Sequence, residues 1–421
     1  MRVRGPCGFV VVALLAVWAA AAPAAPAEDA GARAWSHVAA LAALGPRVAG
    51  SAAERRAAEY VAAHLRSAGY HVQITDFPFP YFETRQVALE VTSPVRVRLS
   101  PRALAYSTGG QVVAPLVVAG RGLVEDFQEV DARGKVALVE RGGITFLQKA
   151  ENAARAGARA VVVYNHEPGP VVGTLTRPAE IPAVTVSREE GLRLRELVGR
   201  GPVVVSLVVD TLLETRASWN VVGELPGRSA ARVLLGAHVD SVEGSPGAND
   251  NASGVAAALE AARLLRSRPP AWTVEVAAFG AEEGGLFGSS AYARSHRARG
   301  LAAMLNLDMV GAGGRLLVGN TAADRRVVDA VLHSARELDI SVEERRMGSS
   351  DHVSFERAGI PAAMLHRPGD PHYHSPEDTP DRVRPQLLDA AVRLAAESLR
   401  RPILVTGGAS RPAASRPRGR L

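Results

Sequence analysis

The spacing of apolar positions changes twice along the chain and divides it into three blocks. Between Ala30 and Tyr81, two stretches have helical spacing, and the second follows a capping Ser51 and ends near Gly69. His71–Phe77 then alternates between apolar and polar residues, which predicts a strand. Between Val87 and Asp210, short β-type apolar runs are separated by glycines. This second block is therefore predicted to be rich in strands.

The third block, Thr211–Thr406, alternates between strand and helix patterns. Such alternation predicts an α/β domain with a largely parallel central sheet. The predicted strands are Val233–His238, Thr273–Gly280, Ala302–Asp308, Leu316–Val318 and Ala362–His366. The predicted helices are Ala252–Arg266, Ser289–His296, Asp324–Leu338 and Pro385–Arg400.

The two ends of the chain have the composition of segments outside the folded body. Arg2 and Arg4 precede a short apolar run and then small residues, which is typical of a cleaved signal peptide over residues 1–27. We therefore expect a secreted or periplasmic protein. An uncleaved leader that anchors the protein in a membrane is the alternative. From Gly407 onward, Gly, Ser, Pro and Arg dominate, so residues 407–421 are predicted to be a disordered tail.

Charge and cysteine content narrow the possible functions. The formal charge is +6, and six arginines in the leader and the tail account for all of it. A nearly neutral body argues against a nucleic-acid partner, which would require a basic stripe on the fold. We also expect no stable membrane partner beyond the export signal. Cys7 is the only cysteine and lies in the leader. Any metal site must therefore use His, Asp and Glu.

Acidic residues and histidines follow the predicted strands of the third block. They are His238, Asp240, Asp250, Glu282, Glu283, Asp308 and His374. Because the carboxyl ends of parallel strands meet at one edge of a sheet, we expect these side chains to converge. Buried carboxylates in such a cluster repel one another unless cations neutralise them, and two metal ions would do so. Nitrogen and oxygen ligands suit zinc, with manganese or cobalt as possible substitutes.

Five segments around these residues resemble the signatures of the dinuclear zinc aminopeptidase family. In chain order they are His238–Ser241, Gly247–Gly254, Ala281–Ser289, Asn306–Gly311 and Tyr373–Thr379. Within the second block, three segments resemble a protease-associated domain, namely Gly134–Arg141, Phe146–Ala156 and Ile181–Val184.

The resemblance implies a fold and its domain boundaries. Residues 30–86 and 211–406 would form a three-layer α/β peptidase domain, with helices on both faces of a mostly parallel or mixed sheet. Residues 87–210 would form an inserted, β-rich protease-associated domain.

The resemblance also implies a role for each site residue. Two Zn²⁺ ions would be bound by His238, Asp250, Glu283, Asp308 and His374. In this arrangement His238 and Asp308 share the first ion, Glu283 and His374 share the second, and Asp250 bridges them.

Three further residues would act without binding metal. Glu282 would be the general base that activates a metal-bridging water, Asp240 would hold His238, and Tyr373 would donate to the oxyanion. A cis peptide between Asp250 and Asn251 is also implied.

Several alternatives remain open. Taken singly, the acidic residues could be loop or capping residues, and His372 competes with His374 as a ligand. Asp351 and His352 are candidates for the substrate pocket. The remaining histidines of this chain, including His366, are interpreted as structural.

The expected function is hydrolysis of the amino-terminal bond of peptides that have a free amino terminus. Carboxypeptidase or dipeptidase action on the same site is an alternative. A glutaminyl cyclase would need only one zinc, and a receptor-like ectodomain would have lost ligands that this chain retains.

Overall fold

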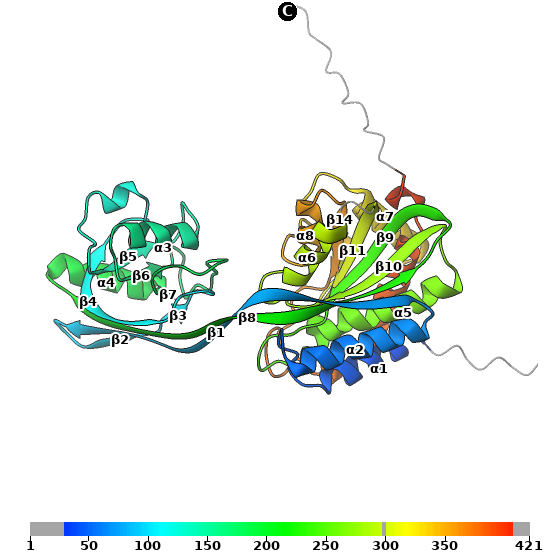
Figure 1. Ribbon diagram of the computed structural model, residues 1–421, viewed down its shortest axis with the longest axis horizontal. Coiled ribbons are helices and arrows are strands. Elements are labelled where there is room, and N and C mark those ends of the chain that lie inside the picture. Colours follow the sequence, from blue (N-terminus) through cyan, green and yellow to red (C-terminus); the bar gives the residue numbers. More distant parts are fainter. Residues whose placement is uncertain (1–28, 297–299, 407–421) are drawn as a thin grey trace, which may run out of the picture.

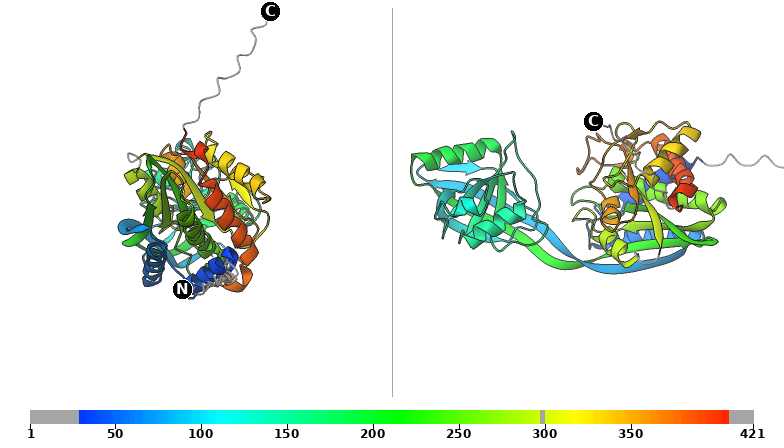
Figure 2. Two further views of the ribbon diagram at one scale, coloured as in Figure 1. Left: turned by 90° about the vertical axis from the view of Figure 1, so that its right-hand side faces the viewer. Right: turned by 90° about the horizontal axis from the view of Figure 1, so that it is seen from above.

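The computed structural model describes residues 29–296 and 300–406, which form two lobes joined by a two-stranded ribbon (Figure 1). The view from above shows the same two lobes at the two ends of the ribbon (Figure 2, right). The predicted signal peptide, 1–27, and the predicted tail, 407–421, lie outside the described residues. No helix within the described ranges is both long and apolar enough to cross a membrane.

The ribbon consists of two unusually long antiparallel strands, β1 (His71–Ser93) and β8 (Val204–Leu225). Their pairing runs from His71 opposite Glu224 to Ser93 opposite Val204. The strand predicted to end at Phe77 therefore continues into the second lobe. Pro78 and Pro80 lie where, among the described strands, β1 pairs with β8 alone, and proline is tolerated at such an edge because its missing N–H group can face away from the partner strand.

The lobe that contains the third block of the sequence, which we call the peptidase lobe after the family it resembles, is built on a mixed sheet. The central strands of this sheet are parallel. Strand β9 lies between β10 and β11, and β11 pairs with β14, all in parallel. Across this lobe the strand order is β13-β12-β14-β11-β9-β10-β8-β1. The remaining bounds are β9 (Ser229–His238), β10 (Trp272–Phe279), β11 (Leu301–Asp308), β12 (Leu317–Gly319), β13 (Glu343–Glu344) and β14 (Ala362–His366).

Helices cover both faces of this sheet. On one face lie α1 (Ala30–Ala42), α2 (Ala52–Ser67), α5 (Gly254–Ser267), α7 (Arg326–Glu337) and α9 (Pro385–Ser398). On the other face lie α6 (Phe287–His296) and α8 (His352–Arg357). Alternate residues of one strand serve the two layers, since Leu235 packs in the larger core and Leu234 in the smaller one. This arrangement confirms the predicted three-layer α/β fold.

The second lobe, which we call the PA lobe, extends the sheet through β4. Its strands are β2 (Val97–Leu99), β3 (Arg102–Ala103), β4 (Gly110–Val118), β5 (Val136–Glu140), β6 (Ala160–Tyr164) and β7 (Ala183–Val186). Its helices are α3 (Phe146–Arg155) and α4 (Arg188–Arg200). They cover opposite faces of the strands: Leu194 of α4 lies in one core and Ala150 of α3 in the other. Helix α4 was not predicted from the sequence.

Candidate metal centre

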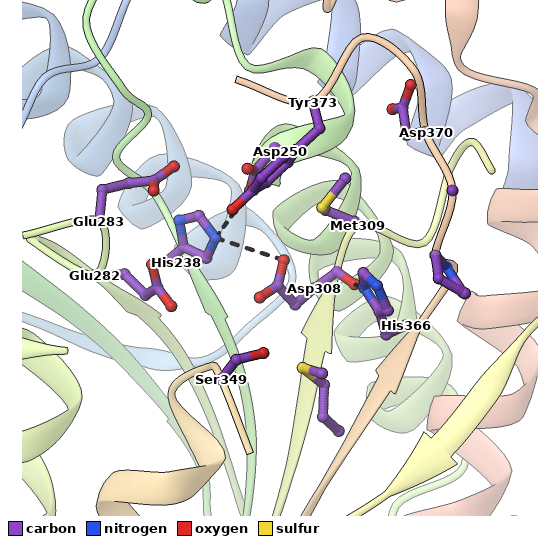
Figure 3. A pocket seen from close by; sticks show the side chains of 13 residues that line it. His238, Asp250, Glu282, Glu283, Asp308, Met309, Ser349, His366, Asp370 and Tyr373 are labelled. Atoms are coloured by element: carbon purple, nitrogen blue, oxygen red, sulfur yellow. Dashed lines mark hydrogen bonds and ion pairs between the residues drawn. The ribbon is translucent and has the colours of Figure 1, made fainter. Parts of the chain in front are cut away.

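The parallel strands deliver the predicted side chains to one edge of the peptidase sheet. Strand β9 ends at His238, and its neighbour β11 ends at Asp308. On the other side of β9, strand β10 ends at Phe279, and Glu282 and Glu283 follow in the next loop. Figure 3 shows that these side chains point toward a common centre.

Asp250 lies between two histidines and offers one carboxylate oxygen to each. Its Oδ1 is 3.2 Å from Nε2 of His238, and its Oδ2 is 3.2 Å from Nε2 of His374. On the first side, Oδ1 of Asp308 is 3.6 Å from Nε2 of His238. On the second side, Oε2 of Glu283 is 3.0 Å from Nε2 of His374. The five predicted ligands thus form two groups that share Asp250.

Burial and mutual proximity shift the pKa values of the acidic residues and histidines in this cluster. Burial raises the pKa of Glu283 to about 7 and, together with neighbouring carboxylates, raises that of Glu282 well above its usual range. Burial alone would lower the pKa of His374, but hydrogen bonds to Asp250 and Glu283 outweigh it and raise the pKa to about 10. The cluster is therefore a concentration of negative charge that stabilises cations.

The donor atoms fit zinc. Within the described residues, two groups of three side chains each bring nitrogen or oxygen atoms to within 4.8 Å of one another. One group is His238, Asp250 and Glu283, and the other is His238, Glu282 and Asp308. Oε1 of Glu283 is buried and has no hydrogen-bond partner among the described residues. Imidazole and carboxylate ligands are those of catalytic zinc sites, and a buried carboxylate oxygen without a donor is suited to a cation.

The loop that carries Asp250 is held by a buried carboxylate outside the predicted ligand set. Asp378 accepts hydrogen bonds from the backbone N–H of Asn249 at 2.7 Å and from that of Asp250 at 3.0 Å. The loop begins at Gly247, whose φ of 61° lies in the left-handed region that favours glycine. The implied cis peptide between Asp250 and Asn251 is present.

The side chain of Asn251 connects this loop to the strand end that carries Asp308. Its amide group donates to the carbonyl of Leu307 at 2.9 Å and accepts from the N–H of Met309 at 3.1 Å. These bonds fix the backbone on both sides of Asp308. The positions of Asp250 and Asp308 are therefore coupled through one amide.

Arg47 is a buried cation beneath the site that the sequence did not single out. It donates to the carbonyls of Val239 at 2.8 Å and Gly247 at 2.9 Å, and also to that of Pro246. Burial lowers its pKa to about 10, although Asp240 opposes the shift. No carboxylate among the described residues takes its N–H groups. Arg47 therefore holds the backbone of the site through hydrogen bonds, and its charge also attracts the carboxylates of Asp250 and Glu283.

Asp240 lies beside His238 and also contacts the loop that carries Glu282 and Glu283. The nearest Asp240 atom to Nδ1 of His238 is the backbone oxygen, at 3.2 Å, while the carboxylate Oδ1 is 3.7 Å away. The Asp240 carboxylate also accepts from the N–H groups of Glu282 at 3.0 Å and Glu283 at 3.2 Å. Asp240 thus anchors the backbone of these two residues.

Tyr373 stacks on the ring of His374, with centroids 3.7 Å apart, and its side chain borders the site (Figure 3). Burial and the nearby carboxylates raise the pKa of its hydroxyl, which therefore stays protonated. His372 does not join the cluster. The structure brings His374, and not His372, to Asp250.

The substrate side of the site differs from the prediction in two respects. Asp351 and His352 are fully buried, whereas Ser349 of the same segment lines the pocket. His366, interpreted as structural, also lines it, and its Nδ1 lies 2.9 Å from the carbonyl oxygen of Asp308. The pocket has a volume of about 270 Å³, and Met309 and Met364 supply apolar surface.

Comparison with known proteins places the chain in a family. Residues 220–399 match the model of Peptidase family M28, and residues 110–194 match that of the PA domain. The sequence is 34% identical to Aminopeptidase YwaD of Bacillus subtilis over 372 residues, which covers 83% of this chain and 79% of the relative.

Two solved structures resemble the fold over 88% of this chain. The aminopeptidase from Aneurinibacillus sp. strain AM-1 has a TM-score of 0.83 and 33% identity, with 93% of its chain covered. The zinc aminopeptidase BSAP from Bacillus subtilis has a TM-score of 0.68 and 32% identity, with 94% covered. The chain therefore belongs to peptidase family M28 and carries a PA domain, as its motifs predicted, and it is a metallopeptidase.

Proposed function

We propose that the protein is an exported aminopeptidase that binds two Zn²⁺ ions and removes the amino-terminal residue of peptides. The observation that carries this proposal is the placement of Asp250, whose two oxygens face His238 and His374 at equal distances of 3.2 Å. A carboxylate so placed is suited to bridge two ions. The similarity to named zinc aminopeptidases supports the metal and the reaction, and the apolar leader supports export.

Each residue of the site has a separate role in hydrolysis. When bound, zinc ions lower the pKa of water and polarise a carbonyl group. Glu282 contributes a carboxylate that takes a proton from the attacking water and returns it to the departing amine. Asp240 fixes the backbone of this residue through its hydrogen bond to the N–H group. The protonated hydroxyl of Tyr373 is available to donate to the oxygen that becomes negative.

The pocket geometry favours removal of a single residue. A volume of about 270 Å³ is at the lower end for a ligand site, and is suited to one amino-acid residue rather than an extended chain. The carboxylates Glu282 and Asp308 line this pocket and would attract the positive charge of a free amino terminus. A carboxypeptidase would need a cation for the terminal carboxylate, and neither Lys nor Arg is among the described residues that line the pocket.

The assignment is tested with matched peptides that carry either a free or an acetylated amino terminus. The proposal predicts that the free peptide loses its first residue and that acetylation abolishes cleavage. Equal cleavage of both peptides would refute aminopeptidase action. Peptides with a free amino terminus and an amidated carboxyl terminus should be cleaved normally, which separates the proposal from a carboxypeptidase.

The role of Glu282 is tested with Glu282→Gln. We expect this variant to keep its zinc but to lose turnover by a factor of about 10² to 10⁴, the usual contribution of a general base. Glu377→Gln, an exposed position in the loop that carries His374, is the matched control. Unchanged turnover in Glu282→Gln would exclude the proposed role. Loss of zinc in that variant would instead make Glu282 a ligand.

A further inference from the structure

A second cavity adjoins the metal site and is formed by both lobes and the ribbon. It has a volume of about 350 Å³ and is lined by Asp240 and Glu283 of the peptidase lobe, by Phe82 of the ribbon and by Tyr106 of the PA lobe. Glu283 also lines the metal-site pocket, so the two spaces lie on either side of this residue. We call the second cavity the interlobe cleft.

The PA lobe is fixed against the loop that carries Glu283. The hydroxyl of Tyr106 is buried and donates to the carbonyl of Gly284 at 2.6 Å. The ring of Tyr106 packs against that of Phe82, with centroids 5.7 Å apart. Phe79 in turn contacts Phe287 of α6 at 5.9 Å. The wall of the interlobe cleft is therefore a packed surface that continues into the loop that carries Glu283.

Aromatic rings and carboxylates supply most of the chemistry of the cleft. The aromatic residues that line it are Phe79, Tyr81, Phe82 and Tyr106, and the acidic residues are Glu83, Asp240, Glu243 and Glu283. The described residues that line it include no Lys, Arg or His. Rings beside carboxylates form an environment that favours cations and rejects anions.

Glu243 is the acidic group in the cleft that is free to meet a ligand. Asp240 is engaged with backbone N–H groups, and Glu283 faces His374. Glu83 lies 3.8 Å from Arg85, which partly neutralises it. Glu243 is exposed and makes no hydrogen bond or ion pair with another described residue. Its charge is therefore directed to whatever enters the cleft.

One arginine lies close to the cleft, but its charge is already balanced. The guanidinium of Arg216 stacks over the ring of Tyr81 at 3.4 Å, and its Nε is 2.6 Å from a carboxylate oxygen of Glu214. Arg216 does not line the cleft. One face of Tyr81 is therefore already occupied by Arg216, and Glu243 is the group in the cleft that remains complementary to an incoming positive side chain.

From these observations we propose that the interlobe cleft binds the part of the peptide that follows the scissile bond, and that Glu243 selects a basic side chain within its first residues. This proposal rests on the proposed function. In this proposal, a peptide whose first residue fills the metal-site pocket extends past Glu283, the residue that lines both spaces. Each further residue of an extended chain spans about 3.3–3.6 Å, so two or three of them reach beyond the catalytic loop.

The test compares peptide substrates that differ only in the residues after the scissile bond. Hexapeptides with the same first residue carry Arg, Ala or Glu at the second, third or fourth position, and kcat/KM is measured for each. Every value is divided by kcat/KM of the same enzyme for an aminoacyl anilide, which has no residue to place in the cleft. The enzymes are the wild type, Glu243→Gln and Glu129→Gln, the last removing an exposed charge on the PA lobe outside the cleft.

We expect the wild type and Glu129→Gln to prefer Arg over Glu at one or more of these positions. Because a partly exposed ion pair contributes about 0.2–1 kcal/mol, Glu243→Gln should reduce that preference by a factor of roughly 1.5 to 5. An unchanged preference in Glu243→Gln, or no preference in the wild type, would overturn the proposal. If the wild type hydrolysed neither the peptides nor the anilide, the proposed function itself would fail, a result distinct from loss of selectivity.

Discussion

Asp378 offers a sharp test of how the metal site is supported, because its carboxylate binds no predicted metal. It is fully buried and accepts two backbone hydrogen bonds, from Asn249 at 2.7 Å and Asp250 at 3.0 Å. In Asp378→Asn the side chain keeps its shape, but one oxygen becomes an N–H₂ group that cannot accept. One backbone N–H is then buried without a partner, and the charge that strengthened the other bond is gone.

The expected loss follows from these two bonds. A hydrogen bond to a charged group contributes about 1.5–3 kcal/mol, so Asp378→Asn should destabilise the protein by about that amount. Because one of these two N–H groups belongs to Asp250, the proposed bridging ligand, zinc affinity should also fall by roughly 10- to 100-fold, as is typical for residues that orient ligands.

The assay combines urea unfolding of the metal-free protein with zinc titration against a competing chelator. Asp381→Asn is the matched control, because it changes an exposed carboxylate three residues away. We expect the control to behave as the wild type in both measurements. If Asp378→Asn kept wild-type zinc affinity, the view that Asp378 positions the bridging ligand would be refuted.

Two further predictions concern the ion pairs of Glu260 in α5 and the contact between the two lobes. Burial would raise the pKa of Glu260, but hydrogen bonds to His37, Arg33 and a neighbouring arginine lower it from 4.5 to about 2. The stabilisation that ionised Glu260 provides is therefore present above pH 4.5 and is lost as the pH falls toward 2, by about 2 kcal/mol between pH 7 and pH 3. The difference in unfolding free energy between wild type and Glu260→Gln, measured by chemical denaturation, should shrink over that range. Tyr106→Phe removes the hydrogen bond to the Gly284 carbonyl and should lower the free energy of unfolding by about 1 kcal/mol. It should also raise KM for peptides more than KM for aminoacyl anilides. An equal change for both substrates would contradict a role of Tyr106 in the interlobe cleft.

Local patterns predicted those elements whose side chains are buried on both faces. Strand β14 occupies the predicted residues, Ala362–His366, and β6 is a continuous apolar run within the block predicted to be rich in strands. The ribbon was underestimated because Pro78 and Pro80 interrupt the strand pattern and residues 83–86 are all polar. Its strands are long because β1 and β8 pair with each other across a large sequence separation, which local patterns do not reveal.

The same distinction applies to the site. The predicted ligands stand in motifs with a recognisable order, and the structure brings all five together. Arg47 was missed because its partners, Val239 and Gly247, are about two hundred residues away in sequence, and nothing local marks the arginine as buried. His366 was missed because its contact is with a backbone carbonyl on the neighbouring strand. Such contacts depend on strand register, which only the folded chain shows.

The central claim is that Asp250 bridges two metal ions, and anomalous diffraction at the zinc absorption edge from crystals of the zinc-loaded protein tests it most directly. The account predicts two anomalous peaks, one beside His238 and Asp308 and the other beside His374 and Glu283, with the carboxylate of Asp250 between them. A single peak, or two peaks of which only one contacts Asp250, would contradict it.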